Sequence, residues 1–283
     1  MKNVMLSVIA VAIALMSFSP LMLLAQDNTP KINFNSMDYM KVTPGMGADY
    51  VQLEAVWKKI HLANIKEGKY DFWELTSVMY PSGTSREYDY VTRIQCAGEK
   101  QYAAFLEGEF FPKNWTSLLT PDEIDLVMRT GEIRKLVKSE VYVAEEYITA
   151  ENMGHPKIHV FNYFDFPKGK NRSDHFKVEK EIWKPVHQAR INDGKLKGWV
   201  LARKLMPFGA SMPYHDATVD LYESMEHYLN TEMMKYFEKV HTKKDTDNLL
   251  ARTNANSILV KGDVRVLVDN TAMKEEGSTA SRK

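Results

Sequence analysis

The chain has 283 residues, of which 44% are apolar and 26% are charged, a composition typical of a globular protein with a core of its own. Lysine plus arginine and aspartate plus glutamate both number 37, so the formal charge is zero. This balance gives no indication of a nucleic-acid partner, and the length allows one large domain or two smaller ones.

Residues 1–25 predict a secretory signal peptide. Lys2 is followed by the apolar run VMLSVIAVAIALMSFSPLMLLA and then by polar residues, which is the order of parts in such a signal. We expect cleavage near Ala25 and a secreted or periplasmic protein that is no longer attached to a membrane. The alternative is an uncleaved anchor, because the run is almost long enough to span a bilayer.

The first predicted elements after the signal are a strand at residues 37–43 and a helix from Asp49 to Lys66, where apolar residues recur at helical spacing. Gly68 ends this helix, because glycine tolerates left-handed backbone geometry. Aromatic and β-branched residues then predict a hairpin of two strands, at residues 70–80 and 87–95.

A helical region follows Gly98, is interrupted near Pro112 and resumes at Thr120, which is a good cap for a helix that starts with proline. A strand is predicted at residues 140–147. Cys96, the only cysteine, excludes an internal disulfide, and we interpret it as a small apolar residue at a strand end.

The second half of the chain repeats this order of elements. The sequence predicts a strand at 157–166, a helix at 173–192, a hairpin at 195–206 and 214–222, a helix at 224–239 and a strand at 257–269. The polar residues from about 273 onward predict a disordered tail.

The two halves also share residues at fixed spacing. The segment Trp57–Thr92 recurs without gaps at Trp183–Thr218, and both copies carry Trp-x-x-x-His, a later glycine, a second tryptophan and a Pro-x-Gly turn before a tyrosine. A weaker match joins RTGEIRKLVKSEVYV, from Arg129, to RTNANSILVKGDVRV, from Arg252. We interpret this as one domain present twice, with repeats at residues 26–150 and 151–272.

The order β-α-β-β-α-β in each repeat is that of a ferredoxin-like unit, whose antiparallel sheet carries helices on one face only. The bare face must be covered, and a second copy of the same sheet would cover it. The expected fold is therefore α+β, with two ferredoxin-like repeats packed sheet to sheet as an α/β barrel within one chain.

The Trp-x-x-x-His helix followed by glycine, a strand and the Pro-x-Gly hairpin resembles the dimeric α/β-barrel superfamily. That resemblance implies a cavity between two sheets. Its members include cofactor-free monooxygenases, EthD proteins, cyclases, isomerases and haem-degrading enzymes. His61 and His187 match the first-helix histidine of the EthD pattern, although the proline two residues after that histidine is absent here.

His61 and His187 are the candidate catalytic residues, since a histidine near neutral pKa can act as an acid or a base. The alternative is a structural role, because a duplicated scaffold keeps scaffold residues in both copies. His155 and His159 lie on the same face of a predicted strand, but no third ligand accompanies them, so no metal site is predicted.

The hairpin strands supply the candidate ligand-binding residues. Trp73 and Trp199 are expected to face the helices, and the alternate residues of their strands are expected to face the cavity. On the returning strands the candidates are Tyr88, Tyr90, Thr92, Tyr214, Asp216 and Asp220.

The function predicted from these observations is an exported protein that binds a small apolar or aromatic molecule, with no cofactor, either as a binding protein or as a monooxygenase-, dehydratase- or isomerase-like enzyme. It would be a monomer or a homodimer. One alternative is a structural or interaction protein whose interior is filled by its own side chains. A third interpretation is haem binding through His61 or His187.

Overall fold

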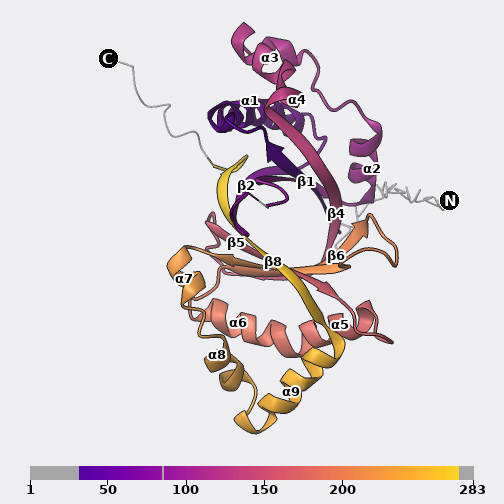
Figure 1. Cartoon of the computed structure of the whole chain (residues 1–283), viewed down its shortest axis with the longest axis vertical. Helices are drawn as coiled ribbons and strands as arrows, with labels where there is room; N and C mark the ends of the chain where they lie inside the picture. The colour runs from indigo at the N-terminus through magenta and orange to yellow at the C-terminus, as the bar shows by residue number, and fades with distance from the viewer. Residues whose placement is uncertain (1–31, 85, 274–283) are drawn as a thin grey trace, which may run out of the picture. The chain divides into compact units, whose positions relative to one another are not determined.

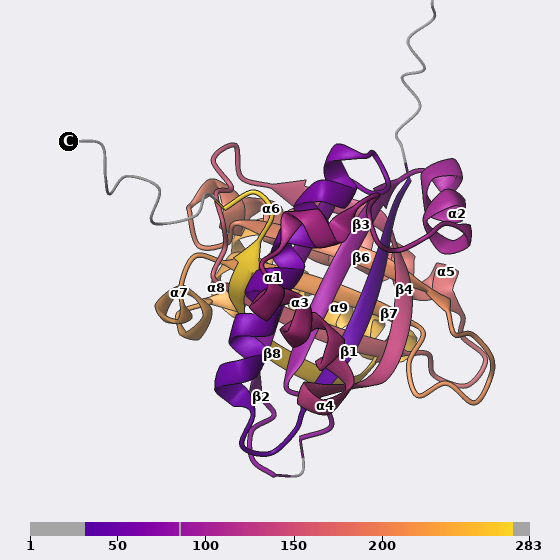
Figure 2. The same cartoon turned by 90° about the horizontal axis from the view of Figure 1, so that it is seen from above.

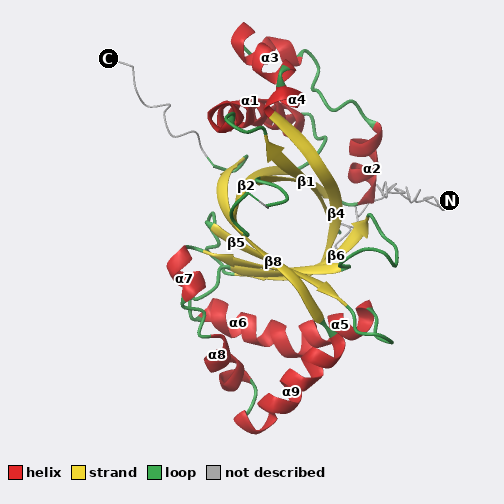
Figure 3. Cartoon of the chain, in the orientation of Figure 1, coloured by secondary structure: helices red, strands yellow, loops and turns green. Residues whose placement is uncertain are grey.

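The computed structural model describes residues 32–84 and 86–273, so the predicted signal peptide and almost all of the predicted tail lie outside the described residues. In the described chain, strands β1 to β8 close into a barrel in the order β1-β3-β2-β8-β5-β7-β6-β4. Helices lie outside the barrel on two opposite sides (Figures 1 and 3). No helix of this part combines the length and apolar character needed to cross a bilayer.

The first half contributes one side of the barrel. Its strands are β1 (Asn33–Val42), β2 (Phe72–Tyr80), β3 (Tyr90–Ala97) and β4 (Arg134–Thr149). Its helices are α1 (Gly47–Lys66), α2 (Glu99–Glu107), the short 3-10 helix η1 (Trp115–Leu118), α3 (Pro121–Met128) and α4 (Thr130–Ile133). The strands pair in the order β4-β1-β3-β2, which is the arrangement of a ferredoxin-like unit.

The second half repeats this arrangement. Its strands are β5 (Ile158–Asp165), β6 (Gly198–Met206), β7 (Asp216–Tyr222) and β8 (Ile258–Asn270). Its helices are α5 (Arg172–Val178), the π-helical segment η2 (Glu179–Trp183), α6 (Lys184–Asn192), α7 (Met225–Leu229), α8 (Met233–Val240) and α9 (Lys243–Asn256). Antiparallel pairing of β4 with β6 and of β2 with β8 joins the halves, which confirms the predicted fold class.

The repeated tryptophans hold each sheet to its helices. Trp73 is fully buried in a cluster with Leu53 and Ile60 of α1, which lies across the outer face of its half (Figure 2). Trp199 is likewise fully buried on the outer face of β6. These contacts confirm that the tryptophan face is the helix face, and they leave the alternate residues of β2 and β6 for the barrel interior.

The structure departs from the predicted elements mainly where helices were expected to be long. β4 begins at Arg134 instead of residue 140, because the preceding segment pairs with β1 in the register Arg134↔Val42 and Leu136↔Met40. The helix expected at 173–192 consists of α5, η2 and α6. Pro185, in the first turn of α6, has no N–H for the helical hydrogen-bond ladder, and the irregular segment lies directly before it.

Candidate functional site

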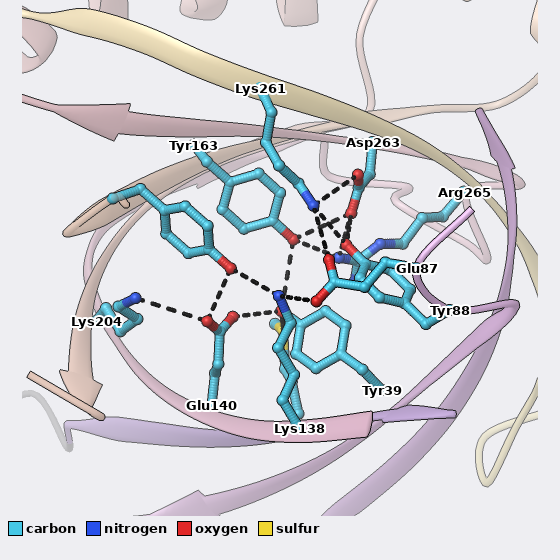
Figure 4. Close-up of polar contacts among 12 residues, drawn as sticks. Tyr39, Glu87, Tyr88, Lys138, Glu140, Tyr163, Lys204, Lys261, Asp263 and Arg265 are labelled. Carbon is cyan, nitrogen blue, oxygen red and sulfur yellow. Dashed lines mark hydrogen bonds and ion pairs between the residues drawn. The ribbon is translucent and has the colours of Figure 1, made fainter. Parts of the chain in front are cut away.

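The barrel interior is divided into a part filled by polar side chains and a part that is hollow. Figure 4 shows most of the filled part, which we call the tyrosine network. Its members are Tyr39, Glu87, Tyr88, Lys138, Glu140, Tyr142, Tyr163, Lys204, Tyr214, Lys261, Asp263 and Arg265.

Two carboxylates organise the tyrosine network. Glu140 on β4 accepts hydrogen bonds from the hydroxyls of Tyr39 at 2.8 Å, Tyr142 at 2.9 Å and Tyr214 at 2.7 Å. Asp263 occupies the equivalent place on β8. Hydrogen bonds to a charged acceptor are stronger than neutral ones, so each carboxylate ties together residues from both halves of the chain.

Asp263 is bound in nearly the same way as Glu140. It accepts from the Tyr88 hydroxyl, from Tyr163 at 3.3 Å and from Arg265 at 3.0 Å. Burial acts to raise the pKa of Asp263, but Arg265 and the Tyr88 hydroxyl outweigh it, and the pKa lies below its ordinary value. Asp263 therefore stays ionised.

Lysines close the tyrosine network on its outer side. Lys138 donates to the Tyr214 hydroxyl at 3.1 Å, and Lys261 donates to the Tyr88 hydroxyl at 3.0 Å. Glu87 lies between the two ammonium groups, at 3.3 Å from Lys138 and 3.9 Å from Lys261. The side chains of the protein itself thus fill this part of the barrel with paired polar groups.

The hollow part is a cavity of about 420 Å³. It reaches solvent at the end of the barrel where exposed residues, Tyr147 and His155 among them, form its rim. Met37 and Phe161, together with Tyr142 of the network itself, lie between the cavity and the rest of the tyrosine network. A volume of this size lies within the range of sites that enclose small molecules.

The two sides of the cavity differ in chemistry. The side made by the first half carries polar side chains, among them Asn33, Asn35, Glu74, Arg93 and Gln95. The second half adds the polar residues His159 and Asn270 beside Glu74, and His155 at the rim. Its remaining side chains in the cavity are apolar, among them Phe161, Val200, Ala202, Val219 and Leu221. We refer to these two sets as the polar wall and the apolar wall.

An ion pair forms the centre of the polar wall. The guanidinium of Arg93 lies 3.3 Å from both oxygens of Glu74, and it also donates to Asn35 Oδ1 at 3.0 Å and Gln95 Oε1 at 3.1 Å. Burial acts to raise the pKa of Glu74, but Arg93 and then His159 outweigh it, so the pKa is lowered and Glu74 is ionised.

His159 completes the polar wall. Its Nε2 lies 3.0 Å from the Pro156 carbonyl oxygen and its Nδ1 lies 3.6 Å from Glu74 Oε1. Burial lowers the pKa of His159 despite the neighbouring Glu74 carboxylate. His155 also lines the cavity, but among the described residues no group of three or more His, Cys, Asp or Glu side chains could hold a metal ion.

The predicted catalytic histidines lie outside the cavity, beneath the helices. The ring of His61 stacks on Trp73 with centroids 4.8 Å apart, and its Nδ1 bonds the Tyr70 hydroxyl at 2.7 Å. Burial, followed by Arg134, lowers the pKa of His61 to about 3. This ring is therefore neutral and serves as a packing group.

His187 has a similar place in the second half. It stacks on Trp199 with centroids 5.4 Å apart, and its Nδ1 lies 3.0 Å from an Arg190 nitrogen and 3.7 Å from Asp220. Burial and then Arg190 lower the pKa of His187 well below its ordinary value. Both histidines are thus buried against the repeated tryptophan beneath the helices, in agreement with the scaffold alternative.

The predicted ligand-binding residues are split between two faces. Tyr88 and Tyr214 point into the barrel, where they belong to the tyrosine network. The expectation that Tyr90, Thr92, Asp216 and Asp220 face the cavity must be corrected, since they lie on the helix face. Tyr90 packs on Tyr50 of α1, and Asp216 pairs with Arg172 of α5 at 2.7 Å.

The physical reason for this difference is local. β3 starts at Tyr90, so Tyr88 lies before the strand and the two-residue alternation does not extend to it. Within β3 the inward residues are Val91, Arg93 and Gln95. Arg93 and Gln95 were missed as site residues, although the sequence shows that their equivalents 126 positions later are Val219 and Leu221.

No protein-family model matches this sequence, and the search of curated proteins found no match. Solved structures share the fold at low identity. A candidate monooxygenase of Fusobacterium nucleatum subsp. nucleatum is 11% identical with a TM-score of 0.52, and the alignment covers 86% of this chain and 94% of that one. The likeness shows that the chain has the fold of the ferredoxin-like α/β barrels.

Two further structures resemble the chain more distantly. A chlorite dismutase variant from Candidatus Nitrospira defluvii is 11% identical with a TM-score of 0.47, covering 84% of this chain and 91% of that one. A haem-binding protein from Thermus thermophilus is 8% identical with a TM-score of 0.43, covering 84% of this chain and 92% of that one.

Proposed function

We propose that the protein binds a small organic molecule in the cavity between the polar and apolar walls. The observation that carries this proposal is the cavity itself, a space of about 420 Å³ at one end of a barrel whose other part is filled. Its lining is mainly apolar with a few convergent polar groups, which is the usual character of a small-molecule site.

The alternative of a completely filled interior draws support only from the tyrosine network. If the interior served packing alone, we would expect the polar wall to be apolar like the wall opposite. Glu74 and Arg93 instead place a buried ion pair beside empty space, an arrangement that costs desolvation and contributes little to stability. A ligand-facing role explains this arrangement better than packing does.

A binding role is better supported than cofactor-free acid–base catalysis. A general base works best when its pKa lies near the operating pH, and Arg93 and His159 together hold the pKa of Glu74 below its ordinary value. His61 and His187 lie on the other face of the sheet, so they cannot reach a molecule in the cavity, whether as acid–base groups or as haem ligands.

The cellular setting in this proposal rests on the N-terminal sequence. Residues 1–25 have the pattern of a secretory signal, so we place the binding function outside the cytoplasm. Such a protein would meet its ligand in the periplasm or the surrounding medium, as a monomer or a homodimer.

The neutral fluorescent probe N-phenyl-1-naphthylamine tests the proposal. We expect saturable fluorescence enhancement with the mature protein, and its loss in Val200→Trp, which places an indole in the cavity. Val51→Trp is the matched control, because Val51 is 51% exposed on α1. Absence of saturable binding in the wild type, or equal binding by both variants, would overturn the proposal, and far-UV circular dichroism verifies that Val200→Trp is folded.

A further inference from the structure

The two walls of the cavity occupy equivalent places in the two halves of the barrel. Glu74 and Arg93 are directly opposite each other on β2 and β3. Val200 and Val219 are directly opposite each other on β6 and β7, 126 positions later in the chain. The same place in the fold therefore carries an ion pair on one wall and two valines on the other.

The ion pair leaves the cavity without an uncompensated charge. Among the described residues, Glu74 and Arg93 are the only Asp, Glu, Lys or Arg side chains that line it. Four of the five N–H groups of Arg93 are accounted for by Glu74, Asn35 and Gln95. An anionic ligand would meet the Glu74 carboxylate and an arginine that is already paired, so its desolvation would not be compensated.

Arg93 also fixes the orientation of the Gln95 amide. It holds Gln95 Oε1 at 3.1 Å, so the amide nitrogen of Gln95 must point elsewhere. Within residues 32–84 and 86–273 that nitrogen has no hydrogen-bond partner, whereas the Asn35 nitrogen donates to the Asn33 carbonyl oxygen at 3.2 Å. Gln95 thus offers a neutral donor, and its equivalent in the second half is Leu221.

From this geometry we propose that the ligand is an uncharged organic molecule. Its apolar face lies on Val200 and Val219, and a carbonyl or ether oxygen on its other side accepts a hydrogen bond from the Gln95 amide nitrogen. This inference rests on the proposed function and names the class of ligand for the same site. The paired Glu74 and Arg93 set the preference for neutral molecules.

Three naphthalene derivatives of similar shape test this class, in displacement of N-phenyl-1-naphthylamine from the wild-type protein. 2-Acetonaphthone is neutral and has an acceptor, 2-naphthoate replaces its methyl group by a charged oxygen, and 2-ethylnaphthalene has no acceptor. We expect 2-naphthoate to bind at least 10-fold more weakly than 2-acetonaphthone. 2-Ethylnaphthalene should bind about 5-fold more weakly, in line with the loss of one neutral hydrogen bond.

Two variants identify the residues responsible. Gln95→Leu copies Leu221, and it should remove the preference for 2-acetonaphthone over 2-ethylnaphthalene, whereas Gln188→Leu on the exposed face of α6 should not. Glu74→Gln frees the charge of Arg93 and should improve the binding of 2-naphthoate relative to 2-acetonaphthone by at least 10-fold. The wild-type comparison needs no variant, so a folding failure of Glu74→Gln leaves the test intact.

The outcomes separate the two proposals. Wild-type protein that binds 2-naphthoate as tightly as 2-acetonaphthone overturns the inference and leaves the binding function standing. If Gln95→Leu keeps the preference for 2-acetonaphthone over 2-ethylnaphthalene, Gln95 is not the hydrogen-bond donor to the ligand. If the reporter itself shows no saturable binding to the wild-type protein, the proposed function falls and the ligand class falls with it.

Discussion

Replacing Glu140 by leucine tests whether the tyrosine network holds the two halves of the barrel together. The hydroxyls of Tyr39, Tyr142 and Tyr214 would all lose their acceptor, and Lys204, which lies 3.6 Å from Glu140, would lose its nearest carboxylate. Removing one partner of a buried ion pair lowers the free energy of unfolding by about 3–5 kcal/mol, because the other charge stays buried without a partner. That is a large part of the roughly 5–15 kcal/mol by which proteins of ordinary stability are folded.

Urea unfolding followed by tryptophan fluorescence measures this cost. We expect Glu140→Leu to lower the free energy of unfolding by about 4 kcal/mol. Glu145→Gln on the same strand is the control, because its partner Arg203 is partly exposed and such pairs contribute less than about 1 kcal/mol. A cost below about 1 kcal/mol for Glu140→Leu would refute the view that this carboxylate organises the interior.

Three further predictions concern other buried groups. Asp263→Leu should destabilise the protein about as much as Glu140→Leu, because Asp263 likewise accepts from tyrosines of both halves, and the same urea unfolding experiment measures it. Burial and then Asp220 raise the pKa of Glu179 from 4.5 to about 8. Between these two pH values Glu179 is therefore protonated in the folded state and ionised in the unfolded state. The contribution of Glu179 to stability should accordingly fall by about 1.4 kcal/mol per unit as the pH rises from 5 to 8. The difference in free energy of unfolding between the wild type and Glu179→Gln, measured across that range, isolates this contribution from that of the buried histidines. The ring-proton NMR shifts of His61, whose pKa burial lowers to about 3, should stay constant between pH 5 and 8, and a titration midpoint near 6.5 would contradict its assignment as a neutral packing group.

The fold was predictable from the sequence because its strongest signal is repeated. The Trp-x-x-x-His helix, the glycine after it and the hairpin occur twice, so each weak local pattern is supported by its copy. Lone patterns were less reliable. Residues 134–139 continue the helical spacing of apolar residues, but pairing with β1 makes them the start of β4, a tertiary effect that a local window does not contain.

The candidate site was harder to predict, because a strand presents alternate residues to opposite faces. Tyr90 and its equivalent Asp216, two of the predicted ligand-binding residues, lie beneath the helices. The corresponding difference on the interior face is Arg93 against Val219, only a few residues along the same strands. Tyr88 points into the barrel but precedes the start of β3. Counting the two-residue alternation from Tyr88 therefore assigned the helix-facing residues of β3 to the barrel interior.

The two parts of the interior differ in how closely the halves agree. In the tyrosine network several equivalent positions carry similar groups, since Lys138 and Glu140 are matched by Lys261 and Asp263, and Tyr88 by Tyr214, although Tyr142 is matched by Arg265. In the cavity the corresponding pairs differ, since Val200 and Val219 stand where the first half has Glu74 and Arg93.

Packing at a two-fold related centre places the same demand on both halves, so similar residues satisfy it. A small organic molecule has no such symmetry, and a pair of identical subunits would place the Glu74–Arg93 ion pair on both walls. Carrying both halves in one chain allows one wall to be polar and the other apolar. The departure from symmetry at the hollow end is therefore what we expect of a cavity shaped around an asymmetric ligand.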